Sequence, residues 1–96
     1  MLVLYSEQAS SDLSKFNHAD RQLIAQKIEY LAANFDKLKF TKKVTELKGT
    51  KHKNIYRFII ARKIRAIFKV ENEKLVLLIL RIGLRKNIYD NDFLQN

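Results

Sequence analysis

The chain has 96 residues, of which 47% are hydrophobic, so it has the length and the apolar content for one domain, residues 1–96, with one modest core. It contains no cysteine and only two histidines, which excludes disulfides and thiolate metal sites, and we predict no metal and no other cofactor. Nineteen Lys and Arg against ten Asp and Glu give a net charge of +9, which is typical of proteins that bind polyanions.

Neither a secretion signal nor a membrane span is expected. Residues 1–5 are apolar but too short for the hydrophobic region of a signal peptide, and no basic residue precedes them. The longest apolar run, residues 75–80, is far shorter than the ~20 residues that a membrane-spanning helix needs. We therefore expect a cytoplasmic protein.

The positive charge is concentrated in one stretch of the chain. Residues 36–53 carry seven lysines and two acids, and residues 54–69 carry five basic residues and no acid. Residues 1–35 sum to −1 and residues 70–96 to zero, so the whole surplus lies between residues 36 and 69. Such a block predicts a positive surface that attracts nucleic acid, whereas a charge needed only for solubility could be scattered.

The first third of the chain predicts a strand and a helical hairpin. Residues 1–6 are rich in strand-forming residues, and Ser6 begins a helix on which Ala9, Leu13 and Phe16 share one face. Asn17 is a second candidate N-cap, followed by apolar residues at helical spacing: Ile24, Ile28, Leu31 and Phe35. We expect this apolar stripe to pack on a flat partner.

From residue 36 the pattern changes twice. Residues 36–53 lose helical periodicity and predict a basic loop, with one short turn at residues 44–47. Residues 55–61 and 64–70 alternate with period two, and the polar residues 71–74 predict a tight hairpin before residues 75–82. This last apolar run predicts a central strand that is covered on both faces. Both glycines, Gly49 and Gly83, are expected in turns.

The predicted fold is therefore α+β, in the order strand–helix–helix–strand–strand–strand. The N-terminal strand and the helical hairpin would pack on an antiparallel sheet of about four strands, with both helices on one face. The other face would be only partly covered and would receive Arg57 and Arg65 from adjacent strands.

Three arginines are the main candidates for a phosphate site. Arg57, Arg65 and Arg85 can converge, since Arg85 follows the last strand. The planar guanidinium pairs with two phosphate oxygens at once and can stabilise the negative charge of a phosphoryl transition state. Tyr89, four residues after Arg85, can stack on a base or transfer a proton.

Other polar residues carry weaker signals. The turn residues Arg62 and Lys63, with Lys48, Lys51 and Lys53 of the basic loop, are expected to bind RNA phosphates. His52 is a candidate general base that is more simply explained as a solvated loop residue, and His18 is expected to be structural.

These residues together resemble the RelE/ParE toxin superfamily. The resemblance covers nearly the whole chain and rests on residues in the same order and at similar spacing: Leu47-Lys48-Gly49, Tyr56-Arg57, Ile64-Arg65-Ala66-Ile67-Phe68, Gly83-Leu84-Arg85 and Tyr89. It implies a toxin of a type II toxin–antitoxin pair, held inactive by a small antitoxin protein, which we expect to be acidic. RelE-like members cut mRNA on the ribosome without a metal, and ParE-like members instead inhibit DNA gyrase.

The resemblance also implies roles for single residues. Arg65, Arg85 and Tyr89 would be catalytic, and Arg57 would bind the RNA backbone. Two positions depart from the family pattern, because Leu84 stands where a histidine is common and Ile59 stands where RelE has a second basic residue. We therefore predict a ribosome-dependent mRNA endoribonuclease, and these departures keep a gyrase inhibitor without nuclease activity as the alternative.

Overall fold

Polar side chains begin both helices, as their positions in the sequence predict. In the computed structural model, which describes residues 1–48 and 53–88, α1 spans Glu7–Ser14 and α2 spans His18–Leu38. The Ser6 hydroxyl accepts a hydrogen bond from the Ala9 N–H at 3.0 Å, and the Asn17 side chain accepts one from the Asp20 N–H at 2.8 Å. Each cap satisfies a backbone donor that the first helical turn leaves without a partner.

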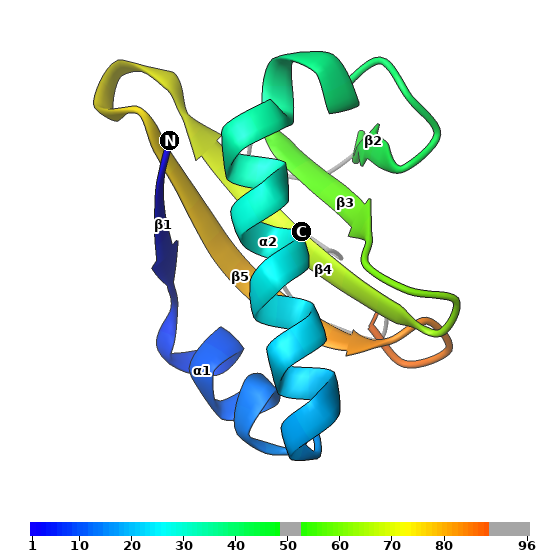
Figure 1. Cartoon of the computed structure of the whole chain (residues 1–96). Coiled ribbons are helices and arrows are strands. Elements are labelled where there is room, and N and C mark those ends of the chain that lie inside the picture. Colours follow the sequence, from blue (N-terminus) through cyan, green and yellow to red (C-terminus); the bar gives the residue numbers. More distant parts are fainter. Residues whose placement is uncertain (49–52, 89–96) are drawn as a thin grey trace.

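The strands form one sheet in the order β1-β5-β4-β3-β2 (Figure 1). Their bounds are β1 Leu2–Tyr5, β2 Val44–Glu46, β3 Ile55–Ile59, β4 Ile64–Glu71 and β5 Val76–Leu84. β1 is parallel to β5 and the other three pairings are antiparallel. The α+β class and the order of the elements are confirmed, although the sheet is mixed and has five strands instead of about four.

The additional strand corrects the prediction for residues 44–47. We expected a turn there, but β2 pairs with β3, with Val44 opposite Phe58 and Glu46 opposite Tyr56. Val44 is buried in the core while Thr45 and Glu46 are exposed. Three residues are too few for the alternation of a strand to stand out in a sequence.

The last strand also differs from its prediction in two details. β5 is an interior strand, as its apolar sequence predicts, but β4 occupies the middle of the sheet. Gly83, which we expected in a turn, lies within β5 opposite Arg65. The strand continues through it to Leu84, and Ile88 packs over Gly83, where an added Cβ would lie 3.7 Å from that side chain.

The main core lies between the helices and one face of the sheet (Figure 1). The predicted stripe of Ile24, Ile28, Leu31 and Phe35 is buried there. The Phe35 ring meets the Tyr56 and Phe68 rings edge-on, with centroids 5.2 and 5.9 Å apart. Edge-to-face contacts of this kind add to the stabilisation that burial alone gives.

A smaller cluster covers part of the opposite face. Ile55 and Ile67 are buried against Ile88, which comes from the turn after β5, and Leu47 and Leu80 pack beside them. The predicted alternation of β3 and β4 is therefore confirmed, because Phe58 and Phe68 lie in the main core while Ile55 and Ile67 lie on the other face. Among the described helices, none is long and apolar enough to cross a membrane.

Leu75 offers a test of the β4–β5 connection. It ends the short 3₁₀ turn Asn72–Lys74 in a left-handed conformation (φ 54°), and its side chain is 66% exposed. Because glycine adopts positive φ without steric cost, Leu75→Gly should raise the free energy of unfolding by about 0.5–1 kcal/mol in urea titrations. Leu2→Gly, at a similarly exposed leucine in β1, should lower it, and a decrease in both variants would contradict the assignment of strain to Leu75.

Candidate functional site

Four exposed basic residues gather where two turns meet. Arg62 and Lys63 lie in the β3–β4 turn, and Arg85 and Lys86 follow β5. The two turns are joined by a hydrogen bond of 2.7 Å from the backbone N–H of Arg85 to the carbonyl of Lys63. We call these four residues the basic corner. Lys63, Leu84, Arg85 and Lys86 line a cavity of about 420 Å³ there.

The charge of the basic corner is not neutralised by the part of the chain that the structure describes. The ion pairs within residues 1–48 and 53–88 join Lys39 to Asp36, Lys74 to Glu71 and Arg81 to Asp12, and none involves the corner. A group of cations that forms no ion pair within residues 1–48 and 53–88 suits a polyanionic ligand such as a phosphodiester backbone.

Arg57 and Arg65 lie on the sheet face opposite the helices, as predicted. Arg57 pairs with Ile67, and Arg65 pairs with Ile59, so the two arginines are diagonal neighbours on adjacent strands. The half-buried Arg57 donates a hydrogen bond of 3.0 Å from Nη2 to the Thr45 hydroxyl on β2. Its head group is therefore held at the β2 side of this face.

Arg65 contacts the backbone of the turn that carries part of the basic corner. It is only 8% exposed, and its Nη1 donates to the carbonyls of Ala61 at 2.6 Å, Ile64 at 3.1 Å and Arg62 at 3.2 Å. These bonds stabilise the β3–β4 turn from within. Arg65 therefore stabilises the fold. The catalytic role that the sequence predicts for Arg65 stays a prediction.

The remaining predicted residues do not join the basic corner in the described structure. Lys48 and Lys53 are exposed near the start of β3, whereas the corner lies beyond its end. Lys51, His52 and Tyr89 lie outside the described residues.

Ser6, the N-cap of α1, and Asp12 within α1 hold the end of β5 in place of a neighbouring strand. Pairing with β1 ends at Tyr5 opposite Ile79. Beyond it, the Ser6 hydroxyl donates to the Leu80 carbonyl at 3.0 Å, and the Asp12 carboxylate accepts the Ile82 N–H at 2.9 Å. Because buried backbone groups need partners, these bonds allow β5 to continue past the end of β1.

The buried Asp12 also forms an ion pair with the half-buried Arg81. The Arg81 Nε lies 2.8 Å from Oδ2 and Nη2 lies 3.3 Å from Oδ1, while Gln8 donates to Oδ1 at 3.0 Å. Asp12 is 4% exposed. Burial acts to raise the pKa of its carboxyl, but the hydrogen bonds from Arg81, the Ile82 N–H and Gln8 outweigh burial and lower the pKa below its ordinary value.

The Asp12–Arg81 pair is not predicted from the sequence, although each partner carries a signal. Asp12 lies near the apolar face of α1, and Arg81 is the only charged residue within β5. A charged residue in an otherwise apolar strand needs a partner, because an isolated buried charge is costly. The distance of 69 residues between the two hides that pairing from local patterns.

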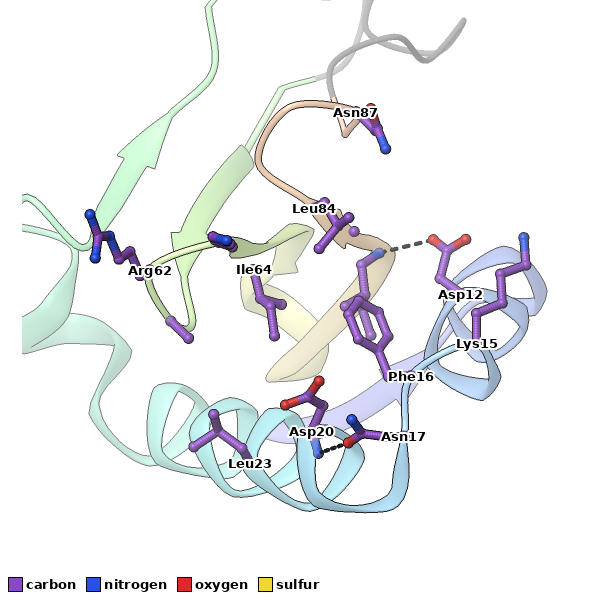
Figure 2. Close-up of a pocket in the computed structure, with 14 residues that line it drawn as sticks. Asp12, Lys15, Phe16, Asn17, Asp20, Leu23, Arg62, Ile64, Leu84 and Asn87 are labelled. Atoms are coloured by element: carbon purple, nitrogen blue, oxygen red, sulfur yellow. Dashed lines mark hydrogen bonds between the residues drawn. The ribbon is translucent and has the colours of Figure 1, made fainter.

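A larger groove runs beside the basic corner, between the α1–α2 connection and the ends of β4 and β5 (Figure 2). Its volume is about 790 Å³, and most of its lining is apolar, including Phe16, Leu23, Ile64 and Leu84. Its polar lining includes Asp20 and Arg62, and Lys63 and Leu84 line both this groove and the cavity at the corner. Within the described ranges, no group of three or more His, Asp or Glu side chains is arranged to hold a metal ion.

Comparison with known proteins identifies the fold. No protein-family model matches the chain, and a search of curated proteins finds no relative. Solved structures do match, among them a chain of a RelB–RelE antitoxin–toxin complex from Methanococcus jannaschii. That chain is 24% identical, the match covers 91% of this chain and 95% of that chain, and the TM-score is 0.66.

Two further matches extend this similarity. A doubly substituted E. coli toxin RelE in the free state is 15% identical over 98% of this chain and 93% of that chain, with a TM-score of 0.71. A YoeB/ParE toxin from Agrobacterium tumefaciens is 18% identical over 88% of this chain and 99% of that chain, with a TM-score of 0.65. The chain therefore has the RelE-like toxin fold, and the resemblance inferred from its sequence is confirmed at this level.

Asp12 makes the stability of this fold depend on pH. The pKa of Asp12 is lower in the folded than in the unfolded protein. Its contribution to the free energy of unfolding is therefore complete at pH values above the unfolded pKa, and it is lost as the pH falls through the native pKa. Asp12→Asn should lower the free energy of unfolding by about 2 kcal/mol at pH 7, since it leaves Arg81 without its buried counter-charge. Urea titrations at several pH values should show this difference shrinking below about pH 4. A difference that does not change with pH would contradict the role of the charge.

Proposed function

We propose that this chain is the toxin of a type II toxin–antitoxin pair and acts as a ribosome-dependent, metal-independent mRNA endoribonuclease. The observation that carries the proposal is the basic corner, in which Lys63 and Arg85 come from two turns joined by a backbone hydrogen bond. The RelE-like fold supports it, because the solved structures that share this fold include RelE toxins.

The proposed reaction is a transesterification within the RNA. The 2′-oxygen of one nucleotide attacks the adjacent phosphorus, the bond to the 5′-oxygen of the next nucleotide breaks, and a cyclic phosphate remains. One proton leaves the 2′-hydroxyl and another reaches the 5′-oxygen, so the step needs no further reactant. The phosphorus passes through a pentavalent state with additional negative charge on its oxygens.

Each predicted residue has a role in this reaction. Arg85 stabilises the pentavalent phosphorus, since a guanidinium can donate two parallel hydrogen bonds to its oxygens. Lys63, Arg62 and Arg57 bind the flanking phosphates, with Lys48, Lys51 and Lys53 adding attraction at longer range. Arg65, which pairs with Gly83 across β4 and β5, acts together with Arg85 on the same phosphate. Tyr89 stacks on a base or moves a proton.

An acidic antitoxin is the proposed protein partner. The structure from Methanococcus jannaschii is a complex of an antitoxin with its toxin, which supports a partner of this kind. The net charge of +9 favours an acidic partner, because opposite charges speed association and select partners.

The second candidate function is inhibition of DNA gyrase through protein contacts alone. Leu84 favours it, because this side chain is apolar and 38% exposed beside Arg85, where the resembling family commonly carries a histidine. The similarity to a protein named as a YoeB/ParE toxin is also consistent with it.

The nuclease proposal predicts that Arg85→Ala abolishes mRNA cleavage while the protein stays folded. The expected loss is about 10²-fold, the effect of removing one donor to a transition-state oxyanion. Arg85 bonds to the β3–β4 turn through its backbone N–H, which an alanine would keep, so the substitution should leave the fold intact. Primer extension after brief induction in bacteria measures new 5′ ends within translated codons.

Arg21→Ala is the matched control, since Arg21 is an exposed arginine on α2 that lines neither the cavity at the basic corner nor the groove beside it. New 5′ ends with the wild type and with Arg21→Ala, but not with Arg85→Ala, would support the proposal. Arrested growth with intact mRNA would refute the nuclease and favour gyrase as the target.

A further inference from the structure

The groove beside the basic corner combines apolar walls with two acidic residues, Asp12 and Asp20. Phe16 follows α1, Leu23 comes from α2, and Ile64 and Leu84 come from the ends of β4 and β5 (Figure 2). Phe16 is the aromatic side chain among these walls, and it is half-buried. A flat apolar ring can therefore enter the groove and lie against aliphatic and aromatic carbon.

Asp20 is the acidic group available to such a ligand. Its backbone N–H is capped by Asn17, but its half-buried carboxylate makes no hydrogen bond or ion pair with residues 1–48 or 53–88. The other carboxylate on the lining, Asp12, already accepts bonds from Arg81 and the Ile82 N–H. A carboxylate accepts hydrogen bonds only, so a ligand at Asp20 has to present donors.

The groove is continuous with the cations of the basic corner. Lys63 and Leu84 line both the groove and the smaller cavity that Arg85 and Lys86 complete. Arg62 stands at the rim on the side of the β3–β4 turn. A ligand that places a phosphate at the basic corner can therefore insert the adjacent group into the groove.

We propose that this groove binds one nucleobase of single-stranded RNA, next to the phosphate held by the basic corner. The base stacks on Phe16, and its exocyclic amino group donates to the Asp20 carboxylate. Adenine and cytosine present such an amino group, whereas uracil carries a carbonyl oxygen at that position and has only its N3–H, flanked by two carbonyl oxygens, as a donor. The groove therefore favours amino-bearing bases over uracil. This inference rests on the proposed function, because the same RNA has to occupy the basic corner.

The groove suits a base better than an acidic peptide. An acidic segment would meet the Asp20 carboxylate, and two like charges that approach in a partly buried site repel each other. RNA avoids this conflict, since its negative charges lie on the phosphates and its bases are neutral. Single-stranded RNA is commonly recognised by stacking together with hydrogen bonds to base edges.

Binding of short fluorescein-labelled oligoadenylate, oligocytidylate and oligouridylate, followed by fluorescence anisotropy, tests the proposal. The wild type should bind the adenylate and cytidylate about tenfold more tightly than the uridylate, the value of one charge-assisted hydrogen bond. Asp20→Asn should reduce this ratio to about one, because an amide can also donate to a uracil oxygen. Phe16→Leu should weaken all three by about tenfold, with thermal melting to verify folding.

Asp36→Asn is the matched control. It removes the same charge from α2, but the Asp36 side chain is 95% exposed near the far end of that helix. It should keep the wild-type ratio, which separates the hydrogen bond from the change in net charge. Lys63→Ala should weaken the binding of all three RNAs about equally, since the Lys63 ammonium binds the phosphate and the discrimination between bases comes from Asp20.

Four outcomes would overturn the inference. Equal affinity of the wild type for all three RNAs, or a ratio unchanged by Asp20→Asn, would refute the base pocket and leave the nuclease proposal intact as long as Lys63→Ala weakens binding. Absence of binding to any RNA at low salt would refute the base pocket, while primer extension after induction would decide the ribosome-dependent nuclease separately. Loss of binding to a protein partner in Asp20→Asn and Phe16→Leu, with an unchanged RNA ratio, would make the groove a protein-docking surface.

Discussion

The hydrogen bonds from α1 to β5 determine where the sheet ends, and both candidate sites depend on that position. β1 pairs with β5 only as far as Ile79, so Leu80 and Ile82 would lack partners on that edge. The Ser6 hydroxyl and the Asp12 carboxylate take the place of the missing strand. β5 can then pair with β4 through Leu84, which brings Arg85 to the β3–β4 turn. One carboxylate in a helix thus fixes the geometry of a site built from other residues.

The same replacement leaves space for the groove. A longer β1 would cover the edge of β5 with backbone, whereas α1 turns away after Ser14 and the chain returns as α2. The groove lies between this connection and the strand ends. Its wall at Ile82 is therefore held by the Asp12 bond, and its opposite wall by the packing of α2 on the sheet. Loss of the Asp12 charge should disturb the geometry of both the groove and the basic corner, whereas a substitution within one of these sites should affect that site alone.

Sequence patterns predicted the features that arise from short-range order. The stripe from Ile24 to Phe35 gave α2, and period-two alternation placed Arg57 and Arg65 on the correct face because the side chains of a strand must alternate. Three features were not predicted from these patterns, for different reasons. β2 is too short to show a period, Gly83 is tolerated within a strand that Ile88 covers, and the Asp12–Arg81 pair joins residues 69 positions apart. The groove was not predicted either, because its walls come from residues that are far apart in the sequence.

The distribution of charge along the sequence located only half of the basic corner. Residues 54–69 carry five cations, but the Arg65 guanidinium donates to three carbonyls of the β3–β4 turn, and that of Arg57 donates to Thr45. Arg62 and Lys63 remain exposed in the turn, where Arg85 and Lys86 join them from a segment whose net charge is zero. Surface potential depends on which cations face solvent together and on how far the nearest carboxylates lie. The positive potential at the basic corner is therefore a property of the fold. It depends on the backbone hydrogen bond between Arg85 and Lys63, because this bond brings the two pairs of cations together.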